Sequence, residues 1–73
     1  MSHEYNAGQR VEVHLDSDTW ESSGWYTGMV IRVDPYTTHR SFYWVELDHE
    51  VQMTSGARTR LISVFNLRKI RKL

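Results

Sequence analysis

Histidine has the widest chemical range among the residues of this chain, because imidazole binds metals and transfers protons near neutral pH. His3, His14, His39 and His49 fall on different predicted elements and lack the paired spacing of a metal site. The sequence contains no cysteine, which excludes thiolate ligands, disulfides and a cysteine nucleophile. We therefore predict no metal site and interpret each histidine as a solvated polar residue.

Carboxylates are the other candidates for catalysis. Glu46, Asp48 and Glu50 share one side of a predicted strand, but acids at a strand end more often form a solvated edge than an acid–base pair. The sequence has neither a glycine-rich phosphate loop nor a serine in a nucleophile-elbow motif. We therefore predict that the protein is not an enzyme and uses no cofactor and no small-molecule substrate.

The charges are divided unevenly along the chain, although they sum to zero. Nine acids and three arginines give residues 1–50 a net charge of −6, whereas residues 51–73 carry six bases and no acid. These bases are Arg58, Arg60, Arg68, Lys69, Arg71 and Lys72. We expect the last strand to pair with the first, so that Glu12 and Asp16 face the basic segment and neutralise it.

Nucleic acid is the alternative partner of this basic segment. Its lysines and arginines could contact phosphates while an exposed Trp25 or Trp44 stacks on bases. A dedicated nucleic-acid-binding domain is more often strongly basic, however, and the isoelectric point of this chain is about 6.9. The sequence therefore favours a protein partner over nucleic acid.

The elements that must position these residues are strands. Val11, Val13 and Leu15 alternate with polar residues, which predicts a strand with one solvated face. Alternation and β-branched or aromatic composition predict five strands, at residues 9–15, 25–34, 42–48, 58–63 and 67–72. Residues 64–66 are expected to form one helical turn, and residues 16–24 a long loop that carries Trp20.

These strands predict an all-β fold, a small and strongly bent five-stranded antiparallel barrel with a short helical turn before the last strand. The 73 residues have room for one domain, residues 1–73, with an ordered core over about residues 8–72. Gly28 lies in the middle of a strand, where glycine marks a bulge or a close backbone approach. The predicted core consists of Val11, Val13, Tyr26, Val30, Val33, Val45, Leu47, Ile62, Leu67 and Ile70.

The sequence also bears on location. No apolar run approaches the roughly 20 residues of a membrane helix, and the first residues do not form a signal peptide. The absence of cysteine fits a reducing compartment. We expect a soluble, cytoplasmic domain without membrane insertion.

Large apolar residues remain on the outward faces of two neighbouring strands: Trp25, Met29, Ile31, Phe42 and Trp44. A contiguous exposed patch usually marks a partner surface, and aromatic residues and methionine are enriched in protein interfaces. The predicted partner-binding residues are Trp20, Trp25, Tyr26, Met29, Phe42 and Trp44, which would meet another protein or a second copy of the chain. Alternatively, the loop with Trp20 folds over the patch and makes a second small core.

The order of several short motifs resembles the Tudor and Agenet branch of the Src-homology-like small barrels. The matching segments are Gly8-x-x-Val11-x-Val13, Gly24-Trp25-Tyr26-x-Gly28-x-Val30, Val33-Asp34, Tyr43-x-Val45-x-Leu47-Asp48 and Val64-x-x-Leu67-Arg68-x-Ile70. The Gly-x-x-Val opening and the Leu-Arg ending also resemble the small barrel subunit of the photosynthetic NADH dehydrogenase-like complex, a docking element for an electron donor. Both resemblances imply the barrel fold and a binding role.

Tudor-type domains bind methylated lysine or arginine in an aromatic cage, through cation–π attraction. The resemblance places the cage positions on Leu15, near Leu47 and near His49-Glu50, so that only Tyr26 retains an aromatic ring. Trp20 and Trp25 could rebuild part of a cage. The resemblance therefore implies an incomplete cage, and a methylated-residue reader is a further alternative function.

Overall fold

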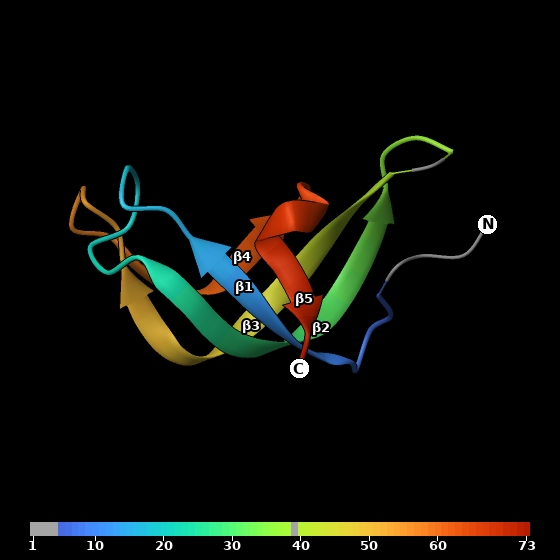
Figure 1. Ribbon diagram of the computed structural model, residues 1–73, viewed down its shortest axis with the longest axis horizontal. Coiled ribbons are helices and arrows are strands. Elements are labelled where there is room, and N and C mark those ends of the chain that lie inside the picture. The colour runs from blue at the N-terminus through green and yellow to red at the C-terminus, as the bar shows by residue number, and fades with distance from the viewer. Residues whose placement is uncertain (1–4, 39) are drawn as a thin grey trace.

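The computed structural model describes residues 5–38 and 40–73, and they form one antiparallel sheet. The strands and the single 3-10 turn are β1 (Arg10–Leu15), β2 (Gly24–Pro35), β3 (Ser41–Gln52), β4 (Arg58–Val64), η1 (Leu67–Lys69) and β5 (Ile70–Lys72). The spatial order is β4-β3-β2-β1-β5 (Figure 1). This confirms the predicted all-β, five-stranded antiparallel fold with a helical turn before the last strand. No helix in the described ranges is long and apolar enough to cross a bilayer.

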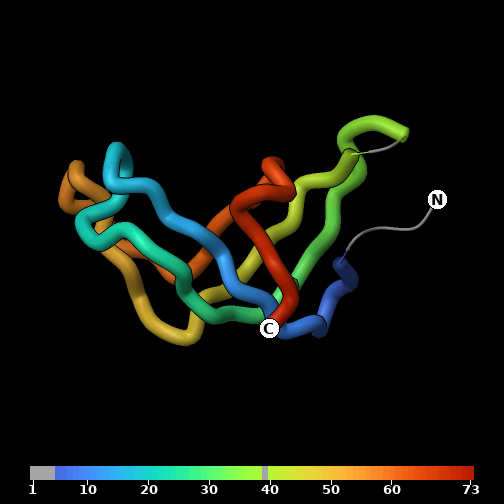
Figure 2. Tube along the Cα trace, viewed as in Figure 1, coloured from blue at the N-terminus to red at the C-terminus, as the bar shows by residue number. Residues whose placement is uncertain are grey.

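The two long strands β2 and β3 bend sharply, and the bend lets the sheet fold over its own core (Figure 2). Gly28 lies at this bend, where a Cβ atom would stand 2.6 Å from the Glu46 carbonyl oxygen. The prediction of a close backbone approach at Gly28 is therefore confirmed. The β-bulge lies further along β2, where Ile31 is the extra residue between Val30 and Arg32.

The core lies between the two halves of this folded sheet. Its buried side chains alternate along the strands and are Tyr5, Val11, Val13, Leu15, Val30, Tyr43, Val45, Leu47, Ile62, Val64 and Ile70. Seven of the ten predicted core residues are among them, and Tyr26 and Val33 are half-buried against the same cluster. Tyr5 was not predicted, because it precedes the strands. Its ring packs edge-on against Tyr43, and its hydroxyl donates to the Ile70 carbonyl at 3.1 Å.

The prediction that Leu67 belongs to the core is wrong, since 44% of this residue is exposed. The helical turn lies at Leu67–Lys69 rather than at residues 64–66. The Asn66 side chain accepts a hydrogen bond from the Arg68 amide at 2.9 Å, so Asn66 caps the turn and the turn starts after it. Val64 stays in β4 and is buried, while Leu67 begins the turn and points to solvent.

The predicted loop at residues 16–24 joins the tip of the β3–β4 hairpin. The Glu21 amide donates to the Gln52 carbonyl at 2.9 Å, and the Thr54 amide donates to the Thr19 carbonyl at 2.8 Å. A single bridge pairs Trp20 with Met53. β3 continues to Gln52, beyond the predicted end at residue 48, because its last residues still pair with β4.

A candidate interaction surface on the outer face of the sheet

Three neighbouring strands present apolar side chains to solvent in adjoining rows of the sheet. Glu46 on β3 pairs with Met29 on β2 and with Leu61 on β4. In the next row Trp44 pairs with Arg32 and with Ser63, and the bulge places Ile31 between the two rows on β2. The exposed fractions are 38% for Met29, 46% for Ile31 and 44% for Leu61. We call Met29, Ile31, Trp44 and Leu61 the outer apolar face.

Trp44 is held in a fixed orientation at the centre of this face. Its indole Nε1 donates to Asp34 Oδ2 at 3.0 Å, and Arg32 Nε donates to the other oxygen of Asp34 at 2.7 Å. Both hydrogen bonds lower the pKa of Asp34, and the bond from Arg32 has the larger effect. An aromatic ring that is anchored by a hydrogen bond and half-buried needs little further ordering to bind a partner.

Phe42 lies two residues before Trp44 and belongs to an aromatic cluster at the same end of the sheet. Its ring packs against Tyr36 at 5.4 Å and against Phe65 at 4.9 Å between centroids. The Arg40 guanidinium lies 5.0 Å from the centroid of Phe65. The cluster therefore ties the β2–β3 turn to the residue that follows β4, and it borders the outer apolar face.

Trp25 lies apart from this face, although alternation places it on the same side of β2 as Met29. It packs edge-on against His14, and the Arg71 guanidinium lies 3.8 Å from its ring centroid. Between Trp25 and Met29 stands Thr27, whose hydroxyl donates to Asp48 at 2.8 Å. The structure thus brings Met29, Phe42 and Trp44 together and separates Trp25 from them.

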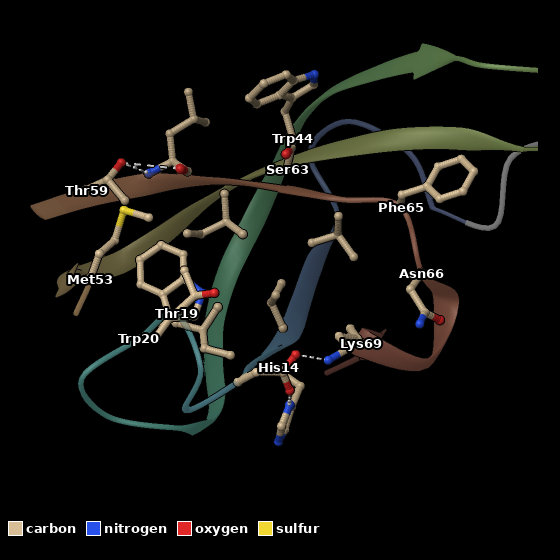
Figure 3. A pocket seen from close by; sticks show the side chains of 16 residues that line it. His14, Thr19, Trp20, Trp44, Met53, Thr59, Ser63, Phe65, Asn66 and Lys69 are labelled. Atoms are coloured by element: carbon tan, nitrogen blue, oxygen red, sulfur yellow. Dashed lines mark hydrogen bonds and ion pairs between the residues drawn. The ribbon is translucent and has the colours of Figure 1, made fainter. Parts of the chain in front are cut away.

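Trp20 and Tyr26 occupy the opposite end of the molecule from the aromatic cluster. Trp20 packs against the core and lines a cavity of about 510 Å³ between β1 and β4 (Figure 3). The loop that carries it does not cover the outer apolar face. The Tyr26 hydroxyl donates to the Ser22 carbonyl at 2.9 Å. Leu15 and Leu47, at the implied cage positions, are buried in the core.

The basic segment is largely engaged within the chain. β5 pairs antiparallel with β1, Arg71 Nε donates to Glu12 Oε1 at 2.8 Å, and Lys69 forms an ion pair with Asp16. This confirms the prediction that Glu12 and Asp16 face the basic segment. Arg60 donates to the Leu47 carbonyl at 3.0 Å, and Arg58 lies 3.9 Å from Glu50. Within residues 5–38 and 40–73, Arg68 and Lys72 have no ion pair.

The two histidines that the structure describes, His14 and His49, lie on different strands. His14 lies on β1 with Nδ1 3.3 Å from Asp16, and His49 is exposed on β3. His3 and His39 lie outside the described residues. In the described part of the chain no three histidines and carboxylates are placed to hold a metal ion.

Leu61 is the residue of the outer apolar face that sequence reasoning missed. The sequence pattern did indicate it: Ile62 was predicted to lie in the core, and alternation along the strand then places the Leu61 side chain on the outer face. Phe65 and Tyr36 of the aromatic cluster carried no such signal, since both lie outside regular strands. Comparisons with protein-family models, with curated proteins and with solved structures found no match.

Proposed function

We propose that this domain is a non-enzymatic protein-binding module, an adaptor or a small subunit of a larger complex, and that it binds through the outer apolar face. The observation that carries the proposal is the register of Met29, Ile31, Trp44 and Leu61 across β2, β3 and β4. Scattered apolar residues are normal on a protein surface, but a group of them gathered around an anchored tryptophan is typical of interfaces.

The surroundings of Trp44 support this role. Arg32 lies beside Trp44 in one row and Glu46 lies between Met29 and Leu61 in the other, so the face combines apolar residues with two charged neighbours. Interfaces commonly combine aromatic and apolar residues with polar groups that stay accessible to solvent. Trp44 is the residue we expect to contribute most of the binding free energy, with Leu61 and Ile31 beside it.

The two alternative functions have less support from the geometry. Four of the six bases of residues 51–73 bind acids or a carbonyl of the same chain, which leaves few cations for a phosphate backbone. A reader of methylated residues needs several ring faces around one cation. Among residues 5–38 and 40–73 no aromatic ring packs against Tyr26, and one face of Trp25 is already covered by Arg71.

The test compares two leucines of equal exposure. Leu61 and Leu67 are each 44% exposed, but Leu67 lies in η1, away from the outer apolar face. Trp44→Ala and Leu61→Ala should weaken self-association, measured by sedimentation, or capture of the partner from an extract of the source cells, whereas Leu67→Ala should not. Equal effects of the two leucine variants, or none from Trp44→Ala, would refute the proposed function.

A further inference from the structure

The outer edge of β4 is open. β4 is the last strand on its side of the sheet, and within the described residues β5, at the other end, pairs only with β1. Adjacent residues of an antiparallel strand direct their N–H and C=O groups alternately toward the two sides. Leu61 directs its groups outward, because its amide binds the Thr59 hydroxyl at 3.0 Å and its carbonyl accepts from the same hydroxyl at 3.2 Å.

Ser63 has the same phase as Leu61, two residues further along β4. Its N–H and C=O therefore also point away from β3, and no group of the described residues binds them. Proteins usually protect such an edge with a side chain, a bulge, a charge or a covering loop. Here the Thr59 hydroxyl protects Leu61 and leaves Ser63 open.

The open edge faces a cavity. The cavity of about 510 Å³ separates β4 from β1, and its size lies within the range of ligand sites. The pairing of β1 with β5 ends at Val13, which is opposite Ile70. The remaining residues of β1, His14 and Leu15, therefore have no partner strand on that side among the described residues and line the cavity wall opposite β4. Figure 3 shows Trp20 and Met53 together on one side of β4, while Trp44, which also lines the cavity, projects on the other side.

Basic residues lie beyond both ends of this cavity. Arg58 and Arg60 lie at the start of β4, and Arg68 follows its end. The nearby acid, Asp16, is already paired with Lys69 and approached by His14. A segment that lies along β4 would therefore meet Arg60 near one end and Arg68 near the other, neither of which is paired with an acid among the described residues, whereas Arg58 lies 3.9 Å from Glu50.

We propose that the seam between β4 and β1 is a second binding site, which adjoins Trp44 and Leu61 of the outer apolar face around the edge of β4, and that it takes an extended peptide segment of a partner protein by strand addition to Ser63. Main-chain hydrogen bonds give such binding its affinity, and alternate side chains give it specificity. The peptide residue opposite Ser63 has its side chain on the same face of the sheet as the Ser63 side chain. The side chains of the two peptide residues next to it therefore lie on the other face, with those of Ile62 and Val64, toward Trp20 and Met53. The segment thus has two apolar residues around one small residue, with acids at both ends.

The test uses the peptide Ac-Asp-Glu-Val-Thr-Val-Glu-Asp-NH2 and amide NMR spectra of the whole chain. Binding should shift the Ser63 amide and slow its hydrogen exchange. The same peptide with all four acids replaced by lysine should bind at least tenfold more weakly, because the arginines would repel it. A peptide with N-methylated central threonine should also lose binding, since it cannot donate to the Ser63 carbonyl.

Two variants of Ser63 complete the test. Ser63→Pro removes an N–H that points away from the sheet and no hydrogen bond to β3, so we expect the fold to persist and peptide binding to be lost. Ser63→Ala keeps the N–H and should bind as the unmodified chain does. If Ser63→Pro does not fold, the N-methylated peptide decides the question. The proposal is overturned if the Ser63 amide does not shift at millimolar peptide, if the N-methylated peptide binds equally, or if a second copy of the chain already protects Ser63.

Discussion

The Arg10 guanidinium binds both carboxylate oxygens of Asp48, at 2.8 and 2.7 Å, and so joins β1 to β3 across β2. Thr27 on β2 donates to the same carboxylate, and the three residues lie on the outward side of the bend next to Gly28. This network explains why the outward side of β2 is divided. Trp25 and Met29 lie on either side of Thr27, so a polar row separates the two apolar residues.

The bonds from Arg10 and Thr27 lower the pKa of Asp48 to about 2. A carboxylate with a lowered pKa stabilises the fold above its ordinary pKa near 3.8, and this stabilisation is lost as the pH falls toward 2. We expect Asp48→Asn to be less stable than the unmodified chain at pH 7. The difference between the two should shrink between pH 4 and pH 2, as measured by urea unfolding. A difference that does not change with pH would show that the ion pair is not linked to folding.

Gly28→Ala tests the close approach at the bend. The added methyl group would stand 2.6 Å from the Glu46 carbonyl oxygen and 2.9 Å from Val45 Cγ1, so the two strands would have to separate. We expect a loss of about 1–3 kcal/mol in the free energy of unfolding, typical of overpacking. Thermal and urea unfolding measure it. If the variant is as stable as the unmodified chain, the bend does not depend on the missing side chain.

Thr59→Val tests whether the Thr59 hydroxyl protects the edge of β4. The substitution removes the group that binds the Leu61 amide and carbonyl, and it leaves a longer open edge beside Ser63. An open edge favours pairing with other chains. We expect stronger concentration-dependent association by sedimentation velocity. Thr59→Ser retains the hydroxyl and is the matched control, so similar association of both variants would contradict the protective role.

Oligonucleotide binding should be weak and only moderately dependent on salt. Arg68 and Lys72 are the bases of the last 23 residues that bind no other group within the described ranges, and two phosphate contacts give a slope of about −1.4 in log K against log salt. Fluorescence anisotropy with a labelled single strand between 20 and 150 mM salt measures this slope. A slope near −4 would mean that all six bases contact phosphates, and nucleic acid would then replace protein as the preferred partner.

The inward and outward sides of each strand could be predicted from the sequence alone. Val11, Val13, Val45 and Leu47 alternate with polar or outward residues, and all four are buried. The pairing of the basic end with β1 also followed from the sequence, because all nine acids precede residue 51 and six of the nine bases follow it. Both inferences depend on local geometry or on charge, which a linear sequence records directly.

The neighbours of each outward residue were decided only by the tertiary structure. Strand order and the bulge at Ile31 set which residues share a row, and neither is encoded by a two-residue period. Arg71 covers one face of Trp25 because β5 pairs with β1, and Leu67 turns to solvent because Asn66 caps the turn before β5. Alternation is a local steric property of one strand. A binding surface depends instead on contacts between strands that are distant in the sequence, which is why the predicted surface separated into two parts.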